Sequence, residues 1–154
     1  MFHVKQLEKN IQNAQKEIQK YLDILLLWQQ HVNLISNNTI KDIWVRHVLD
    51  SAQLFYLLPP SVNTLIDVGS GGGFPGIILG ILNKVNKNPI QKIILIESDL
   101  KKSLFLKEVS RQLNLGIEVI NDRVEKIENL KADILTCRAF SELNQILILC
   151  KKIY

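Results

Sequence analysis

The sequence contains few of the residues that form metal centres, disulfides or covalent catalytic sites. Its 154 residues include two cysteines, Cys137 and Cys150, and three histidines without the spacing of metal ligands. We therefore expect no metal site, and no nucleophilic role for Cys137. Met1 leads into a polar stretch with no secretory signal, and no apolar run is long enough to cross a bilayer. These absences indicate a cytoplasmic protein with reduced thiols and no membrane partner.

Aromatic residues are also scarce, at 6% of the chain, which argues against an aromatic platform for single-stranded nucleic acid. The net charge of +4 and the pI of about 9.1 suit an anionic partner such as RNA. Because the lysines are spread over the whole chain, most of them are expected simply to be solvated. Charge by itself therefore adds little to the case for RNA.

The first third of the chain has the pattern of helices. Between residues 4 and 32, apolar residues recur at spacings of three and four, which predicts one amphipathic helix with the stripe Leu7, Ile11, Ala14, Ile18, Leu22 and Leu25. Thr39 is expected to be the N-cap of a second helix over residues 40–57. We therefore predict an N-terminal helical extension over residues 1–60.

Residues 61–154 are expected to form an α/β core. Strands are predicted over residues 64–68, 93–96, 117–120 and 133–136. Helices are predicted over residues 75–82, with Pro75 in the first turn, over residues 101–113, with Leu104, Phe105 and Val109 inward, and after Ser141 as an N-cap. Strands that alternate with helices indicate βαβ units and a parallel, doubly wound sheet.

The main chemical signal is the glycine loop, residues 69–76, which follows the first strand directly. A glycine-rich turn between strand and helix lets backbone N–H groups approach a ligand closely. Gly69, Gly71 and Gly73 follow Asp67, an acid that suits the cationic amino-acid tail of S-adenosylmethionine and would repel a pyrophosphate. Glu97, which ends the second strand, is expected to accept hydrogen bonds from ribose hydroxyls.

A second pattern in the same loop leaves another cofactor open. Gly71, Gly73 and Gly76 fit the G-x-G-x-x-G dinucleotide fingerprint, which would indicate a nicotinamide-dependent (NAD) oxidoreductase. No Tyr-x-x-x-Lys pair accompanies the fingerprint to serve hydride transfer. We therefore favour S-adenosylmethionine and keep the oxidoreductase as an alternative.

Several motifs together carry a family resemblance. They are Asn33-Leu34, Arg46-His47-Val48-Leu49-Asp50-Ser51, the stretch from Asp67 to Gly76, Arg123-Val124-Glu125 and Arg138-Ala139-Phe140. In this order, over nearly the whole chain, they resemble the RsmG (GidB) type of 16S ribosomal RNA guanine-N7 methyltransferases. The resemblance implies a Rossmann-like class I S-adenosylmethionine-dependent methyltransferase sheet, with cofactor contacts at Gly69, Phe74, Val124, Glu125 and Arg138.

The implied reaction transfers a methyl group to N7 of a guanine in the 530 loop region of the small-subunit rRNA. Guanine N7 carries a lone pair and no proton, so the reaction needs no general base, and alignment of the reactants can suffice. The absence of an evident catalytic dyad in the sequence agrees with this chemistry. The sequence names no catalytic residue.

The chain departs from the family at its C-terminal end. The family sheet has strand order 3-2-1-4-5-7-6, and here the sequence stops after the helix that follows the fourth strand. We therefore expect an incomplete sheet whose fourth strand is an uncovered edge, with self-association through that edge. A truncated, catalytically silent remnant is the second alternative.

Overall fold

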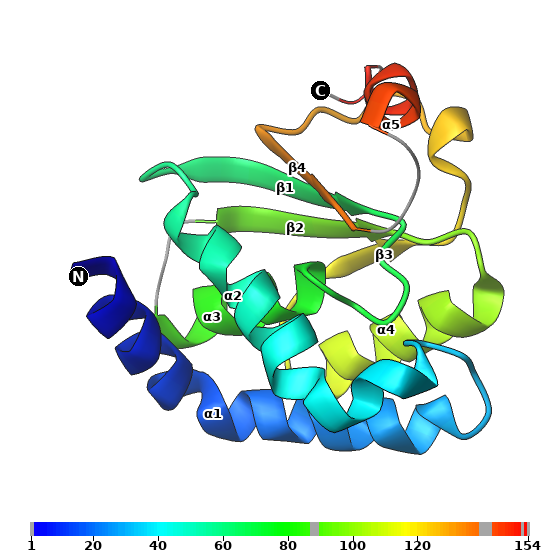
Figure 1. Ribbon diagram of the computed structural model, residues 1–154. Helices are drawn as coiled ribbons and strands as arrows, with labels where there is room; N and C mark the ends of the chain where they lie inside the picture. The colour runs from blue at the N-terminus through cyan, green and yellow to red at the C-terminus, as the bar shows by residue number, and fades with distance from the viewer. Residues whose placement is uncertain (1, 87–89, 139–142, 152, 154) are drawn as a thin grey trace.

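A four-stranded parallel sheet forms the centre of the protein (Figure 1). The computed structural model describes residues 2–86, 90–138, 143–151 and 153. The strands are β1 (Val62–Val68), β2 (Ile90–Ile96), β3 (Glu118–Ile120) and β4 (Ile134–Cys137). Their spatial order is β3-β2-β1-β4, and all three pairings are parallel. The predicted α/β class and strand order are therefore confirmed.

Helices cover both faces of the sheet because side chains along each strand alternate between the faces. Leu65 and Leu95 point to one face, in a core shared with α1 (Phe2–Gln29), α3 (Gly76–Asn86) and α4 (Leu100–Gln112). Ile66 and Ile94 point to the other face, in a second core that Ile153 and α5 (Leu143–Cys150) help to cover. Figure 1 shows α1, α3 and α4 below the sheet and α5 above it.

Helix α1 belongs to the larger of these cores rather than standing apart from it. Ala14, Ile18, Tyr21 and Leu25 are all fully buried, and their spacing of three or four residues places them on one side of the helix. They pack in the same cluster as the apolar residues of α3 and β1. The division of the chain at residue 60 stays a prediction, but α1 is in direct contact with the elements that carry the glycine loop.

The segment between α1 and β1 differs from its prediction. Its helical turns begin at Asn37, after Ser36, with a 3₁₀ turn over Asn37–Asp42 and a π-helical turn over Trp44–Leu49. They continue through α2 (Asp50–Gln53) to a 3₁₀ turn at Leu54–Tyr56. The prediction of Thr39 as an N-cap is wrong, because Thr39 lies inside the first turn, where its hydroxyl donates to the Ser36 carbonyl oxygen at 2.7 Å.

Two helix details after the loop are also corrected. Helix α3 begins at Gly76, and the carbonyl oxygen of Pro75 accepts from the amide of Leu79, so Pro75 lies just before the first turn. Leu104 is 47% exposed, because the buried side of α4 passes through Phe105 and Val109 instead. Ser141, expected as the last N-cap, lies outside the described residues, as do Ala139 and Phe140.

One edge of the sheet carries β4. This strand pairs with β1, and within the described ranges no further strand pairs with its other side. Near its start, the amide of Ala132 donates to the carbonyl oxygen of Ile153 at 2.8 Å, which holds the end of the chain beside the sheet. In the described part of the chain, no helix combines the length and apolar character that crossing a membrane requires.

Candidate functional site

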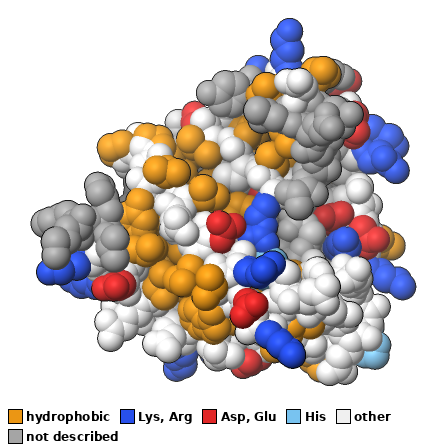
Figure 2. Space-filling view, in the orientation of Figure 1, with side chains coloured by type: hydrophobic (Ala, Val, Ile, Leu, Met, Phe, Trp, Pro, Cys, Tyr) orange, Lys and Arg blue, Asp and Glu red, His pale blue; other side chains and the backbone are white. Residues whose placement is uncertain are grey.

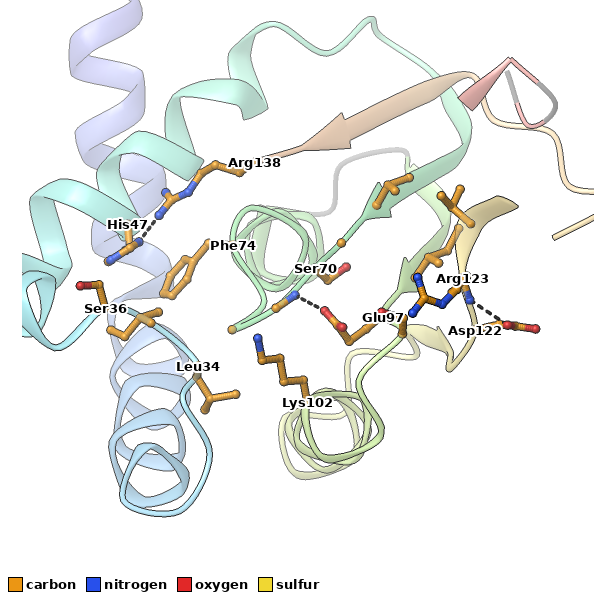
Figure 3. Close-up of a pocket in the computed structure, with 18 of the residues that line it drawn as sticks. Leu34, Ser36, His47, Ser70, Phe74, Glu97, Lys102, Asp122, Arg123 and Arg138 are labelled. Atoms are coloured by element: carbon orange, nitrogen blue, oxygen red, sulfur yellow. Dashed lines mark hydrogen bonds between the residues drawn. The ribbon is translucent and has the colours of Figure 1, made fainter. Parts of the chain in front are cut away.

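A cavity of about 490 Å³ opens where the carboxyl ends of the strands meet, the usual ligand position in an open α/β sheet (Figure 3). Its lining comes from the glycine loop, the ends of β2 and β4, residues 122–125 after β3, and residues 34–36, Thr39 and His47. The segment between α1 and β1 therefore forms one wall of the cavity, and the sheet forms another.

Most of the candidate site residues lie around this cavity. The lining includes Gly69, Gly71, Phe74, Glu97, Val124, Glu125 and Arg138. The two other candidates are not part of the lining: Asp67 lies beneath the glycine loop, and Gly73, within the loop, faces Ile77 and Tyr21. Among the residues that the structure describes, no cluster of His, Cys, Asp and Glu is arranged to hold a metal ion.

The glycines of the loop serve two different purposes. Gly69, Gly71 and Gly73 all have positive φ angles, of 68°, 52° and 95°, a conformation that glycine adopts without strain. A Cβ atom on Gly71 would meet only the Gly69 carbonyl oxygen, at 3.8 Å, so this backbone is open to a ligand. A Cβ atom on Gly73 would lie 2.6 Å from the Ile77 side chain, so the packing at this position leaves room only for glycine.

Tyr21 supports the loop from below. Its buried hydroxyl donates to the carbonyl oxygen of Gly72 at 2.5 Å, and its ring lies 5.3 Å from the Phe74 ring. Burial raises the pKa of Tyr21, which keeps the hydroxyl protonated as a donor. Helix α1 thus holds the glycine loop in position, although Gly72 lies 51 residues further along the chain than Tyr21.

Replacing Tyr21 by phenylalanine removes this hydrogen bond and keeps the ring, so it separates the contribution of the hydroxyl from that of the ring packing. The Tyr21→Phe protein should lose about 1 kcal/mol of stability and bind a loop ligand several-fold more weakly, because the Gly72 carbonyl loses its donor. Urea unfolding and calorimetry with S-adenosylhomocysteine measure the two effects. Unchanged values in both experiments would show that the hydroxyl does not hold the loop.

Asp67 organises the loop rather than facing the cavity. Its carboxylate is 1% exposed, accepts from the Thr136 hydroxyl at 2.8 Å and accepts from the Gly76 amide at 3.3 Å. Thr136 stands opposite Asp67 in the β1–β4 register. Burial raises the pKa of Asp67 to about 6, although these hydrogen bonds lower it. In the structure the Asp67 carboxylate contacts the start of α3, and its expected contact with a cationic ligand tail stays a prediction.

Glu97 both holds the loop and lines the cavity. One carboxylate oxygen accepts from the amide of Gly71 at 2.8 Å (Figure 3). The other accepts from the amide of Asp99, also at 2.8 Å. The carbonyl oxygen of Glu97 accepts from the Asn121 side chain at 2.9 Å, which ties the end of β2 to the segment after β3. That segment brings the buried side chain of Val124 to the cavity wall.

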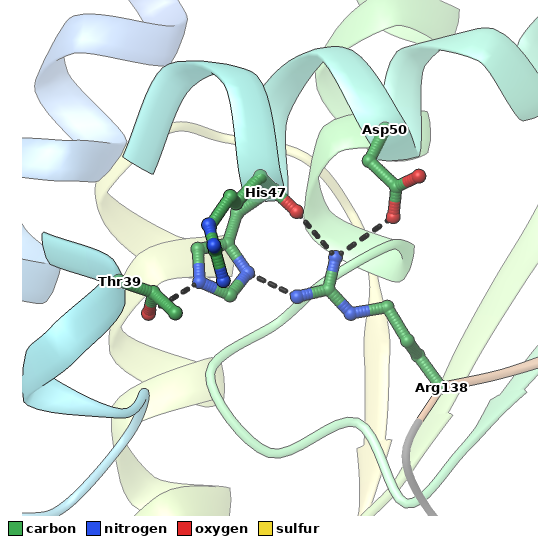
Figure 4. Close-up of polar contacts among 5 residues, drawn as sticks. Thr39, His47, Asp50 and Arg138 are labelled. Carbon is green, nitrogen blue, oxygen red and sulfur yellow. Dashed lines mark hydrogen bonds and ion pairs between the residues drawn. The ribbon is translucent and has the colours of Figure 1, made fainter. Parts of the chain in front are cut away.

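Arg138, directly after β4, is held by the turn that precedes α2 and by the first residue of α2 (Figure 4). Its Nη1 donates to the Asp50 carboxylate and to the carbonyl oxygen of Arg46, each at 3.1 Å, and its Nη2 donates to Nδ1 of His47. The guanidinium also lies 5.8 Å from the centre of the Phe74 ring. Hydrogen bonds therefore join the motif at residues 46–51 directly to the motif at Arg138.

His47 is neutral in this arrangement. Burial and the adjacent Arg138 guanidinium lower the pKa of His47 to about 4. Because Nδ1 accepts from Arg138, the proton is on Nε2, which donates to the Thr39 hydroxyl at 2.8 Å. The imidazole stacks on Phe74 with 4.9 Å between ring centres. Arg138 also pairs with Asp50, and Arg46 pairs with Asp42. Figure 2 shows acidic and basic side chains close together near the middle of the face that it draws.

A comparison with known protein families matches residues 14–154 of this chain to the family described as "rRNA small subunit methyltransferase G". The chain belongs to this family. Its curated relatives include proteins of that name from Rickettsia typhi, 48% identical over 134 residues, and Rickettsia prowazekii, 45% identical over 131 residues. These alignments cover 84% and 85% of this chain but 66% and 65% of the relatives, so the chain spans about two thirds of their length.

Solved structures confirm the fold of this family member. The O-methyltransferase from Bacillus cereus, in complex with S-adenosylhomocysteine, matches 88% of the chain and 62% of its own, with a TM-score of 0.56 and 14% identity. A coclaurine N-methyltransferase matches 98% of the chain and 54% of its own, with a TM-score of 0.52 and 16% identity. The chain therefore has the α/β fold of class I S-adenosylmethionine-dependent methyltransferases.

Some residues of the cavity had no assigned site role in the sequence analysis. Thr39 and His47 line the cavity, as do Leu34, Ser36, Lys102 and Asp122. Leu34 and His47 lie within motifs that the sequence did single out, which was the available signal. Lys102 is a lysine near the start of an amphipathic helix, where sequence pattern gives no reason to prefer it over its neighbour Lys101.

Proposed function

We propose that the chain is a cytoplasmic S-adenosylmethionine-dependent methyltransferase that acts on N7 of a guanine in the 530 loop region of 16S ribosomal RNA, in the small ribosomal subunit. The observation that carries the proposal is the family match over residues 14–154. The geometry of the cavity agrees with it. Family membership favours this function over the alternative of an NAD-dependent oxidoreductase.

The residues around the cavity suit S-adenosylmethionine. Each oxygen of the Glu97 carboxylate accepts one backbone N–H and keeps a lone pair that can accept from a ribose hydroxyl. Val124 offers an apolar surface for an adenine ring, and the open backbone at Gly71 leaves room for the amino-acid tail beside Gly69, which also lines the cavity. Arg138 lines the cavity and keeps N–H groups on Nε and Nη2 that could donate to the carboxylate of that tail. When bound, the cofactor supplies an electrophilic methyl group on a sulfonium.

The protein's part in the reaction is to align the acceptor and exclude water. Guanine N7 carries no proton, so transfer of the methyl group from the sulfonium sulfur to N7 would break the S–C bond, leave S-adenosylhomocysteine and need no residue to act as a base. His47 is committed to Arg138 and Thr39, and Asp67 lies beneath the loop, so neither is offered to the cavity as a base. The apolar side chains of Leu34 and Phe74 exclude water from their side of the cavity.

Calorimetry tests the cofactor assignment. S-adenosylhomocysteine should bind the purified chain, and NAD should bind at least tenfold more weakly, because the Gly71 amide, which a pyrophosphate would need, already donates to Glu97. A Glu97→Gln protein should bind S-adenosylhomocysteine more weakly, since one acceptor for ribose is replaced by a donor. Tighter binding of NAD than of S-adenosylhomocysteine would contradict the assignment.

A labelling experiment tests the reaction itself. The chain is incubated with labelled S-adenosylmethionine and with small subunits from a strain that lacks its own copy of the enzyme, and the RNA is cleaved at N7-methylguanine. Label at an exocyclic amine or a ribose hydroxyl would contradict the N7 assignment. Absence of label, from protein that binds the cofactor, would favour the silent remnant instead.

Self-association through the β4 edge also stays a prediction, which light scattering checks.

A further inference from the structure

A second hollow of about 500 Å³ adjoins the cofactor cavity. It is lined by residues 33–38 and by Lys102, and it shares Leu34, Ile35, Ser36 and Lys102 with the cavity lining. Figure 3 shows the Lys102 side chain extending from the start of α4 toward the cavity. We name residues 33–38 together with Lys102 the polar groove, because it leads from the protein surface to the cofactor cavity.

The backbone of the polar groove is held in place by one side chain. The Gln29 amide oxygen accepts from the amides of Leu34 and Ile35, at 2.9 and 3.1 Å. Its amide nitrogen donates to the Ile35 carbonyl oxygen at 2.8 Å and to the Asn37 side chain at 3.0 Å. Four hydrogen bonds from the end of α1 therefore fix the loop, so its polar side chains are presented to a ligand at little further entropic cost.

The chemistry of the polar groove suits a nucleotide strand. Asn33, Ser36, Asn37 and Asn38 are exposed, and their side chains can donate to or accept from base edges and sugar hydroxyls. The Asn37 oxygen accepts from Gln29 and keeps a second lone pair, so both this oxygen and the NH2 group can serve a ligand. Among the described residues that line the polar groove, Lys102 carries the only charge, and it is a cation suited to a phosphate.

We propose that the polar groove guides single-stranded RNA next to the target guanine into the cofactor cavity, with a backbone phosphate on Lys102 and base or sugar groups on Asn37 and Asn38. The inference rests on the proposed function and specifies which surface receives its substrate. Proteins recognise RNA sequence mainly in single strands, and a base must leave its stack to enter a cavity. The nucleotides beside it then need a surface that continues from the cavity, which the polar groove supplies.

Two variants in the polar groove and one matched control test the proposal. Lys102→Gln removes the cation, and Asn38→Asp adds a negative charge with little change of shape at a position that does not line the cofactor cavity. Lys101→Gln is the control, because Lys101 is exposed on the same turn of α4 and lines neither hollow. Binding of a labelled single-stranded 12-nucleotide RNA containing guanine is measured by fluorescence anisotropy at several salt concentrations.

Both groove variants are expected to bind this RNA at least fivefold more weakly than the natural chain, while Lys101→Gln stays within twofold. The Lys102→Gln protein should also lose about 0.7 from the slope of log K against log salt, the value for one phosphate contact on a single strand. Asn38→Asp should leave S-adenosylhomocysteine affinity unchanged.

If both groove variants bind the RNA as tightly as the natural chain does, the proposal that the polar groove guides RNA is wrong. The proposed function would still stand. A natural chain that binds S-adenosylhomocysteine but not the RNA would also overturn the groove proposal. Failure of the natural chain to bind S-adenosylhomocysteine would refute the proposed function, and the groove proposal with it. The cofactor measurement therefore distinguishes the two failures.

Discussion

A Gly73→Ala protein is expected to lose most of its ability to bind S-adenosylhomocysteine and a large part of its stability. The added methyl group would lie 2.6 Å from the Ile77 side chain and 3.0 Å from the Tyr21 hydroxyl, in a backbone with φ of 95°. Overpacking and left-handed strain together should cost about 2–5 kcal/mol. Relief of the clash requires the loop to rise from α1, which breaks the bond between Tyr21 and Gly72.

Gly116 provides the matched control for this substitution. It also has a positive φ, of 65°, but an added Cβ atom would meet no atom within 4 Å. Gly116→Ala should therefore cost only the backbone strain, about 1–2 kcal/mol, and should leave ligand affinity unchanged. Urea denaturation and calorimetry on both proteins make the comparison. Equal losses in the two proteins would show that crowding at Gly73 contributes nothing.

The stability of the protein is expected to fall as the pH rises from about 4 to about 7, through ionisation of Asp67. Burial raises the folded-state pKa of Asp67 from 3.8 to about 6, so the folded state holds a proton that the unfolded state releases. The resulting contribution to stability is fully present below pH 4 and is lost as the pH rises through 6. Since one pH unit in a pKa corresponds to about 1.4 kcal/mol, the loss is about 3 kcal/mol.

An Asp67→Asn protein isolates this contribution from those of other carboxyl groups. The asparagine cannot ionise, and its amide can still accept from Gly76 while donating to Thr136. Unfolding free energies measured at pH 4, 5, 6 and 7 should show the natural protein losing about 3 kcal/mol relative to the variant. A difference between the two proteins that does not change with pH would mean that the Asp67 pKa is close to its ordinary value.

The sheet could be predicted from the sequence because each strand is a short apolar run followed by a helical pattern. The four predicted strands differ from the observed ones by at most three residues at either end. The glycine loop and Glu97 were also located, because turn chemistry and strand ends are local properties. The placement of Asp67 was missed, although alternation along β1 puts it on the face of Leu65, which α3 covers.

Other parts of the site depend on contacts that local patterns do not encode. Arg138 meets His47 across 91 residues, and Tyr21 meets Gly72 across 51. The second contact requires only that one buried position of α1 carries a hydroxyl, which the hydrophobic pattern does not reveal. The turns that bring Thr39 and His47 to the cavity are 3₁₀ and π-helical, and their periods differ from the 3.6 residues assumed in reading the sequence.

The hydrogen bond between Tyr21 and Gly72 joins α1 and the glycine loop into one cooperative unit. The loop cannot open without breaking that bond, and α1 cannot detach without exposing Ala14, Ile18 and Leu25 to water. A ligand on the loop is therefore expected to slow amide hydrogen exchange in α1, a helix whose residues do not line the cavity. Protection would appear in α1, on the far side of the loop from the ligand.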